Sequence, residues 1–478
     1  MESQRYDVVV LGGAFSGSAA ALLLRREAPD LSVLVVEKGA RFDAKVGEAT
    51  TEMSAMFLTR RLALWEHLER EHLPKEGLRY WFTNERVRHH GDASETGGFL
   101  RSTVPSFQLR RDVLDEHLLG LAAGAGAEVW RPARAVDCDL GEEGGEHRVT
   151  VETGEGRREV RCRFLLDATG RATFLAKRLG LVERLDEHAT SSWWCRWRGV
   201  RHLDDLAARE HPELAAGNVG SRRLATNHYP GYGFWVWVIP LGNGETSIGV
   251  VFDRRLVDLD RRGEPRRAYR EFLLAHPLLA ELLAGAEMRE EDFRGYSRLA
   301  YLSRQFAGPG WALLGDAAAF LDPYYSPGLD HAAFTVEASV ELVQAAARGE
   351  AMGERIALHN ETFVRSYRRF FDAVYRDKYL YMGEHDLLSA AFLIETAQYY
   401  LFVVIPAFRV HRRFHWMPVL GPREAFFNYR LMRLANRRLG RIALARRTAG
   451  EAGRRNDGRR VRAFFALGGA PCAWRRGG

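Results

Sequence analysis

The sequence predicts an α/β fold in which a Rossmann-type parallel sheet is joined by an inserted antiparallel sheet and a helical C-terminal region. Three observations predict it. An apolar strand runs into a glycine-rich loop and a helix near the N-terminus, residues 187–255 are rich in Trp, Val and Ile between turn residues, and the pattern is helical from 329 almost to the end. At 478 residues the chain is long enough for about two or three structural units.

The first segment alternates strand, loop, helix and strand. Residues 6–11 are a Val/Leu run that ends at glycines, and residues 16–28 and 32–37 are expected to form the next helix and strand. Between them, Gly12-Gly13-Ala14-Phe15-Ser16-Gly17 fills the G-x-G-x-x-G pattern, with Ala14 at the central glycine. Gly12 allows a tight turn, Gly17 lets the helix approach the sheet, and the helix N-terminus attracts a pyrophosphate. The segment therefore predicts a dinucleotide site.

An acidic residue stands where such a site needs one. Glu37 lies twenty residues after Gly17, at the end of the second predicted strand, and Lys38 follows it. A carboxylate in this place accepts hydrogen bonds from ribose hydroxyls. We expect both residues to contact the nucleotide.

The remaining elements alternate between two predicted sheets. A loop at Gly47-Glu-Ala-Thr50 leads into a helix to about residue 70, strands follow at 78–84 and 98–101, a helix at 107–123, strands within 128–166, the main antiparallel sheet within 187–255, and a short returning strand at 311–314. The expected nucleotide domain is thus assembled from 1–78, 106–182 and 296–345. The expected substrate domain comprises 79–105 and 183–295, and residues 346–478 form the helical region with a basic tail.

Charge is distributed unevenly along the chain. From Arg409 to the C-terminus there are eighteen arginines, no lysines and three acids, which is about +15, so residues 1–408 carry about −8 of the net +7. Such a tail can bind nucleic acid, anionic lipid or an acidic protein, or can be a solvated helical face with a frayed end. No nucleic-acid motif accompanies it, so we expect no nucleic-acid partner. We also expect residues after about 447 to be dispensable for folding.

Cysteine usage and hydropathy indicate a cytoplasmic enzyme without a metal. The four cysteines lack metal-ligand spacing, and the N-terminus runs almost directly into a strand, without a signal peptide. The apolar stretch 387–408 is interrupted by Glu395, Gln398 and Pro406. It therefore favours a core or interfacial helix, compatible with peripheral membrane contact, over a span.

Three later segments resemble flavin monooxygenases of the p-hydroxybenzoate-hydroxylase type. Arg111 stands at a helix start, Leu165-Leu-Asp167-Ala-Thr169-Gly170 resembles the strand that ends near the cofactor, and Leu314-Gly315-Asp316 resembles the motif whose aspartate binds the ribityl chain. The resemblance covers about residues 6–345 and implies FAD. Besides the phosphate loop, it implies a cofactor site made by Glu37, Lys38, Ala49, Arg111, Val136, Asp167, Asp316, Pro323, Gly328 and Leu329.

A narrower resemblance, to flavin-dependent halogenases and the related geranylgeranyl reductases, rests on three sites. The motif Trp235-x-Trp237-x-Ile239-Pro240 is complete, Lys75 follows Gly-Glu-Ala at the place of the active-site lysine, and Asp322-Pro-Tyr-Tyr325-Ser326-Pro327-Gly328 matches the halide segment. Taken alone, the first is also a half-buried strand and the second a solvated loop lysine. The resemblance implies that halide attacks a flavin hydroperoxide and that Lys75 directs the resulting hypohalous acid onto an electron-rich aromatic ring. It also implies a substrate channel that contains Trp235, Trp237 and Tyr325.

Two departures bear on that activity. Tyr325 replaces the glutamate of tryptophan halogenases, which redirects the substrate. Pro327 has no N–H to donate to halide, which leaves Gly328 and the Ser326 hydroxyl to bind the anion.

The sequence leaves three functions open. The chain is an FAD-dependent oxidoreductase that halogenates a small or carrier-tethered substrate, or a hydroxylase, dehydrogenase or geranylgeranyl-reductase-like enzyme that uses no halide. The third alternative is a flavoprotein that docks an acidic carrier protein. Because a second G-x-G-x-x-G loop is missing, we expect a separate flavin reductase to supply electrons.

Overall fold

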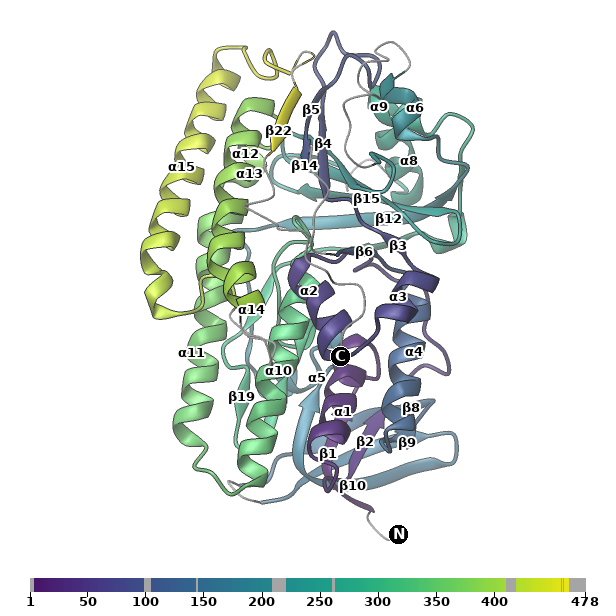
Figure 1. The fold of residues 1–478 in the computed structure, drawn as a ribbon, viewed down its shortest axis with the longest axis vertical. Coiled ribbons are helices and arrows are strands. Elements are labelled where there is room, and N and C mark those ends of the chain that lie inside the picture. Colours follow the sequence, from purple (N-terminus) through teal and green to yellow (C-terminus); the bar gives the residue numbers. More distant parts are fainter. Residues whose placement is uncertain are drawn as a thin grey trace.

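Two large sheets, two small ones and a column of long helices make up the described part of the molecule (Figure 1). The computed structural model describes residues 4–98, 105–142, 145–208, 221–259, 263–409, 418–456, 458 and 460–463. The predicted fold class is confirmed: an α/β nucleotide-binding unit and a largely antiparallel second sheet lie beside helices from the C-terminal part of the chain.

The first sheet is parallel at its centre. β1 (Gln4–Leu11) lies between β10 (Gly156–Asp167) and β2 (Val33–Val36), and the sheet continues to β20 (Trp311–Leu313) and β7 (Glu128–Trp130). The Val and Leu runs at its centre are buried, as in parallel sheets generally. An antiparallel arm, made of β8 (Ala133–Asp139) and β9 (His147–Thr153), pairs with the first half of β10. The predicted strands at 6–11, 32–37 and 311–314 are confirmed.

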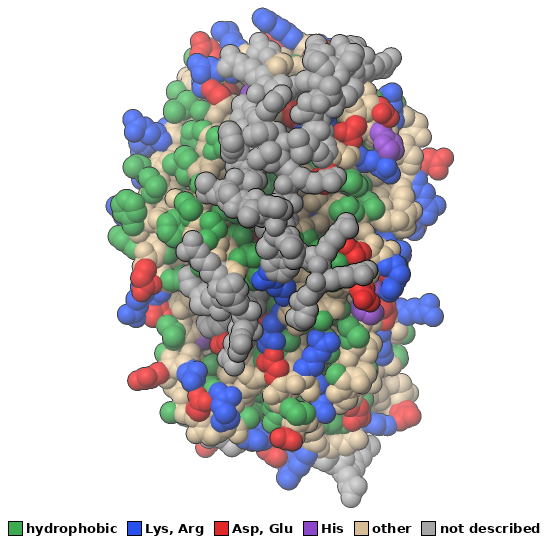
Figure 2. All heavy atoms as spheres, viewed as in Figure 1, with side chains coloured by type: hydrophobic (Ala, Val, Ile, Leu, Met, Phe, Trp, Pro, Cys, Tyr) green, Lys and Arg blue, Asp and Glu red, His purple; other side chains and the backbone are tan. Residues whose placement is uncertain are grey.

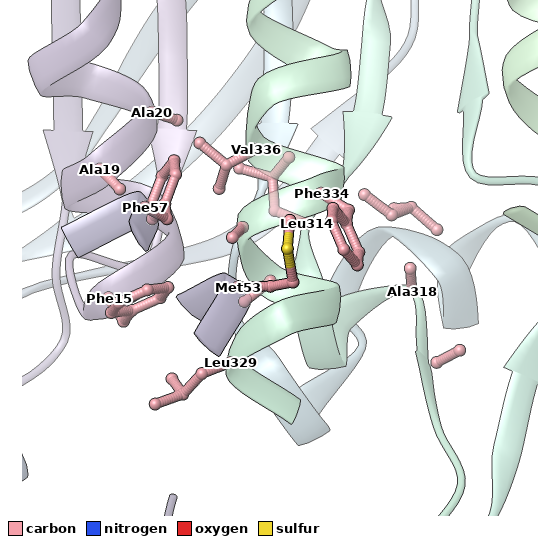
Figure 3. Packing of buried hydrophobic residues seen from close by; sticks show 14 of the residues in the cluster. Phe15, Ala19, Ala20, Met53, Phe57, Leu314, Ala318, Leu329, Phe334 and Val336 are labelled. Carbon is pink, nitrogen blue, oxygen red and sulfur yellow. The ribbon is translucent and has the colours of Figure 1, made fainter. Parts of the chain in front are cut away.

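Three helices meet above the carboxyl end of β1. α1 (Phe15–Glu27) packs against α4 (Arg111–Gly124) and α10 (Gly328–Ala347). Figure 3 shows the small side chains Ala19 and Ala20 of α1 in this core, with Val336 of α10 between them and Phe334. Because the alanines are small and fully buried, the helices approach closely and their N-termini gather near one another.

The second sheet joins the two inserted segments. Its order is β16-β12-β15-β14-β13-β4-β5-β22, with β17 pairing to β12. Most pairs are antiparallel, but β13 pairs β4 and β22 pairs β5 in parallel. Leu203, Tyr269 and Leu279, from the helices behind the sheet, form a second apolar core with its strands. The strands are β4 (Leu78–Phe82), β5 (Ser94–Gly98), β12 (Thr190–Arg198), β13 (Thr226–Gly231), β14 (Phe234–Pro240), β15 (Glu245–Asp253), β16 (Glu287–Met288) and β17 (Arg294–Tyr296), and the helices behind them are α6 (Leu203–Ala208), α8 (Pro265–Ala275) and α9 (Pro277–Leu282).

The predicted helical region is confirmed between residues 328 and 448. Its elements after α10 are α11 (Gly353–Phe370), η5 (Phe371–Tyr375), α12 (Lys378–Tyr381), α13 (His385–Tyr399), η6 (Tyr400–Val404), α14 (Ile405–Arg409), η7 (Arg423–Ala425) and α15 (Phe426–Thr448). The segment around the predicted strand 98–101 differs slightly, because β5 ends at Gly98 and residues 99–101 lie outside the described part.

The chain beyond α15 corrects one prediction. It returns to the second sheet as β22 (Arg460–Ala463) and is not helical there. Asn456 is buried, donates to the carbonyls of Thr83 (3.0 Å) and Gly383 (2.7 Å), and accepts from the His385 N–H (2.9 Å). Residues 448–456 and 460–463 therefore contact the rest of the fold, which corrects the expectation of a solvated segment and leads us to expect that they contribute to stability. Residues 464–478 of the basic tail lie outside the described part.

Candidate functional site

The phosphate loop has the close backbone packing that its glycines predict. Gly12 has a φ of +95°, and a Cβ added there would lie 2.5 Å from the Ala168 carbonyl oxygen. A Cβ on Gly17 would lie 1.8 Å from the Gly12 carbonyl oxygen. Ala14 caps α1 without a side-chain hydrogen bond, so the first N–H groups of the helix keep their donors for an anion. The loop fits a pyrophosphate.

Glu37 holds this loop from the end of β2. Its Oε2 accepts from the Gly13 N–H (2.7 Å) and its Oε1 accepts from the Gly39 N–H (2.8 Å). Each carboxylate oxygen keeps acceptor capacity for a ribose hydroxyl. Glu37 therefore has a structural role together with the predicted role in binding. Lys38 beside it is exposed.

Asp316 is the residue that the resemblance places against the ribityl chain of the flavin. Its half-buried carboxylate accepts no hydrogen bond from the described residues. Burial raises its pKa, while Arg171, Arg111 and Lys45 oppose that shift. A Cβ on the preceding Gly315 (φ +53°) would lie 2.9 Å from Ser16 Oγ, so this segment touches the phosphate loop. A carboxylate left without a partner, between two helix N-termini, fits the hydroxyls of a ribityl chain.

The other predicted cofactor residues lie on several helices, strands and loops of the first domain. Arg111 starts α4 and donates to the Val46 and Gly47 carbonyls. Ala49 is buried and forms an isolated β-bridge with Gln108. Val136 lies at the β-bulge of β8, and Leu329 lies in the first turn of α10, a few residues after Pro323. Asp167 is fully buried and accepts from the Thr169 N–H (2.8 Å) and the Leu175 N–H (2.7 Å), so its side chain stabilises the turn after β10, and its contact with the cofactor stays a prediction.

A cavity of about 480 Å³ lies between α10, the loop around Lys75 and the C-terminal helices. Most of its wall surface is apolar and partly aromatic, as in pockets for small molecules, but five carboxylates also line it: Glu52, Glu76, Asp330, Glu395 and Glu424. Its lining residues include Lys75, Tyr325, Pro327, Glu395, Phe402 and Met432.

Lys75 is a buried residue and not a solvated loop lysine. Its residue surface is 7% exposed, and its Nζ donates to the Thr50 carbonyl (2.6 Å). The Lys75 N–H donates to the Ser106 carbonyl (2.8 Å), and Ser106 Oγ donates back to the Lys75 carbonyl (2.9 Å). Burial lowers the pKa of Lys75 to about 8, while Glu52 and Asp330 oppose the shift. The loop thus fixes an amine in the cavity wall.

Tyr325 is held by residues that the sequence did not single out. Its hydroxyl donates to Glu395 Oε2 (2.7 Å), and the buried Lys378 donates to both Glu395 oxygens (2.6 and 2.7 Å). Asn436 also donates to Glu395 (2.7 Å). Burial raises the pKa of Tyr325 well above its ordinary value and lowers that of Lys378. Glu395 interrupts the apolar stretch 387–408 in the sequence, and that interruption was the available signal.

The halide segment has an unusual backbone. Tyr325 and Ser326 have φ values of +74° and +57°, the left-handed region that non-glycine residues seldom adopt. The Ser326 N–H donates to the Pro323 carbonyl (2.9 Å), and Pro327 caps α10 without an N–H. The donors left are the first N–H groups of α10, from Gly328 and Leu329.

The two motif tryptophans do not line this cavity, and their place in a substrate channel stays a prediction. Trp235 Nε1 donates to the Tyr379 hydroxyl (3.0 Å), and its ring lies 5.1 Å from that of Tyr324. Trp237 packs over Gly249 and donates to Ser247 Oγ (3.2 Å). They form a layer behind Tyr324, whereas its neighbour Tyr325 lines the cavity as predicted.

The described residues contain no group of three or more His, Cys, Asp or Glu side chains that could hold a metal ion. One helix in the described part, His385–Phe408, is long and apolar enough to cross a membrane by length and composition.

The comparisons with known proteins agree with this geometry. Residues 7–187 match the family model of FAD-dependent oxidoreductases. The flavin-dependent halogenase chlA of Dictyostelium discoideum is 26% identical over 87% of this chain and 72% of that protein. The tryptophan 2-halogenase of Chondromyces crocatus is 28% identical over 76% of this chain and 65% of that protein.

Solved structures give the same fold. The halogenase PltM superposes with a TM-score of 0.75 at 19% identity, and 94% of each chain is covered. The flavin-dependent brominase Bmp2 superposes with a TM-score of 0.69 at 21% identity, and 92% of this chain and all of that one are covered. The predicted resemblance and the predicted FAD cofactor are confirmed.

Proposed function

We propose that this chain, which is similar to flavin-dependent halogenases and matches the model of FAD-dependent oxidoreductases over residues 7–187, halogenates an electron-rich aromatic ring beside Lys75. Bound FAD, once reduced, supplies the activation of O₂ by which halide is oxidised. The observation that carries the proposal is a buried ammonium group in the wall of an aromatic cavity. An amine is costly to bury, so its position needs a reason other than stability.

Lys75 is proposed to orient the oxidised halogen toward the substrate. Because its pKa is about 8, most of the amine is protonated at neutral pH. One of its three N–H donors is used by the Thr50 carbonyl, which leaves two for species in the cavity. A cation that only donates hydrogen bonds suits an electronegative oxidant and polarises it toward an incoming ring.

Tyr325 is proposed to position the substrate. Its hydroxyl hydrogen is used by Glu395, and Lys378 Nζ donates to its oxygen at 3.5 Å, so one lone pair of that oxygen is left to accept a hydrogen bond from the O–H or N–H of a phenol, pyrrole or indole. The Glu395 charge is itself balanced by Lys378. Halide is proposed to bind the N–H groups of Gly328 and Leu329 at the α10 N-terminus.

The proposed partners are a free or carrier-tethered substrate and a source of electrons. A relative 26% identical over 69% of this chain is named for a pyrrole-2-carbonyl substrate on a peptidyl carrier protein, so a tethered substrate is included beside a free one. Electrons are proposed to come from a separate flavin reductase. The halide-free alternatives of hydroxylation and dehydrogenation are not favoured, because the matched relatives named above are halogenases.

The test is turnover of FAD-loaded protein with a separate NADH-dependent flavin reductase and a panel of phenols, indoles and pyrroles. Parallel reactions contain bromide, chloride or neither, and mass spectrometry identifies the products. We expect halogenated product only with halide, and more with bromide, which is easier to oxidise and less costly to desolvate. Hydroxylated or dehydrogenated product at equal rates in halide-free buffer would overturn the proposal.

A further inference from the structure

The C-terminal helices expose an apolar surface. α13, η6 and α14 form one helical run, His385–Phe408. The most apolar 18 residues of this run have a mean hydropathy of 1.6, yet only 39% of them are buried in the protein. Leu393, Leu401 and Phe402 are each at least 40% exposed. Between Asp386 and Arg409 the only charged residue is Glu395, which is buried against Lys378. The outer side of this run therefore presents no charge to solvent.

α15 adds a second exposed face beside it. Phe427 is 74% exposed and Leu434 62%. At about 100° per residue, these two fall with Leu431, Arg438 and Arg441 inside an arc of about 80°. Figure 2 shows hydrophobic side chains gathered on the side of the molecule where α13 and α15 lie in Figure 1. Large apolar side chains and cations thus share one exposed face, so burial of apolar area and attraction to anionic headgroups can act at the same surface.

The cations on this face are free to bind an external anion. α15 contains seven arginines and no acidic residue between Phe426 and Thr448. Arg433 and Arg446 pair with Asp372 and Asp386, but in the described part of the chain Arg438 and Arg441 make no ion pair. Guanidinium groups bind phosphate in two-pronged geometry and attract anionic headgroups.

The same surface borders the cavity. Phe402 is exposed and also lines the cavity, and Asn428 and Met432 of α15 line it from the other side. An apolar molecule dissolved in a bilayer would meet the cavity at this surface.

We propose that this face, made of the outer side of His385–Phe408 and the Phe427–Arg441 side of α15, docks on an anionic lipid bilayer. The run lies on the bilayer and does not cross it, because its inner side packs on the protein and carries Glu395 in an ion pair with Lys378. An acidic protein would pair with the arginines, but it would leave the uncharged outer side of His385–Phe408 without a partner. The lipid surface satisfies both features.

The test is co-sedimentation of the FAD-loaded full chain with vesicles of phosphatidylcholine, with and without phosphatidylglycerol. We expect binding to the anionic vesicles, little binding to neutral ones, and release by salt. Arg438→Gln with Arg441→Gln should lower the partition coefficient about 30-fold, at about fivefold for each lost charge. Phe427→Ser with Leu434→Ser should lower it at least about tenfold, because two apolar side chains no longer insert.

A matched pair provides the control. Arg134→Gln with Arg223→Gln removes the same charge from exposed positions on other elements and should leave binding unchanged. All three double variants change exposed residues, so flavin content and melting temperature should match the wild type. Absence of binding to anionic vesicles, or equal losses in the control pair, would overturn the proposal. So would capture by an immobilised acidic protein without any vesicle binding.

Discussion

Replacing Lys75 by methionine should make the protein more stable while product formation is lost. The residue Lys75 is 7% exposed, and the pKa of its amine falls from 10.5 to about 8 on burial. That difference corresponds to about 3 kcal/mol of free energy that opposes folding at neutral pH. Methionine has a similar length and no charge, so the cost disappears with little change in packing.

The substitution also has a cost. The Thr50 carbonyl loses its 2.6 Å hydrogen bond from Nζ, which costs about 1–2 kcal/mol in a buried place. The net expectation is a gain of about 1–2 kcal/mol, or about 2 °C in melting temperature for a chain of this length. Product formation should fall at least about a hundredfold, while flavin reduction and oxygen uptake continue.

The pH dependence of the stability difference between Lys75→Met and the wild type shows whether the buried charge causes that difference. A lysine with a lowered pKa in the folded state destabilises the protein fully below pH 8, and the destabilisation is relieved as the pH rises from about 8 to 10.5. The advantage of Lys75→Met, measured at equal flavin content, should therefore shrink over that interval. Lys177→Met, at an exposed position, is the control and should change neither quantity. A variant that is less stable than the wild type at pH 7, or that keeps most of its product rate, would refute the reasoning.

Three further changes test separate parts of the structure. Gly17→Leu should abolish FAD binding, because any Cβ there lies 1.8 Å from the Gly12 carbonyl oxygen, and normal flavin absorbance in the purified variant would contradict this. Pro327→Ser restores a backbone N–H at the α10 start and should lower the KM for bromide about fivefold, as one added hydrogen bond of about 1 kcal/mol implies; an unchanged or higher KM would count against the halide site. Truncation after Arg447 removes β22, the hydrogen bonds of Asn456 and the Gly453 N–H to Glu384 (2.7 Å), so it should lower the melting temperature, and a truncated chain as stable as the full one would show that these contacts contribute nothing.

The first sheet could be predicted because its signals are local. The Val and Leu runs of β1 and β2 end at glycines or polar residues, and the G-x-G-x-x-G pattern links them within a few residues. Glu37 was found for the same reason, since its position follows from the length of one βαβ unit.

The sequence could not show the contacts that surround the predicted site residues. Period-two alternation identifies the strand of Trp235 and Trp237 but not which layer their side chains enter, and here Tyr324 lies between Trp235 and the neighbouring Tyr325. For Asp167, the motif does not show that the carboxylate accepts hydrogen bonds from the turn that follows its own strand. Glu395 reads as an interruption of an apolar helix until Lys378 and Tyr325 are placed around it.

The basic tail was misjudged for a related reason. β22 is a short edge strand whose parallel pairing with β5 joins residues 460–463 to residues 95–98. Composition indicates a solvated segment there, because hydrogen bonds to a distant strand leave no periodic apolar pattern.

The central claim is that halide is oxidised in this protein and that Lys75 places the halogen on the substrate. The most direct measurement compares wild type and Lys75→Met in reactions that contain bromide, an aromatic substrate and a scavenger of hypohalous acid in bulk solution. We expect the wild type to brominate the substrate, and the variant to brominate only the scavenger. Product that forms equally without bromide, or substrate bromination that is unchanged in Lys75→Met, would contradict the account.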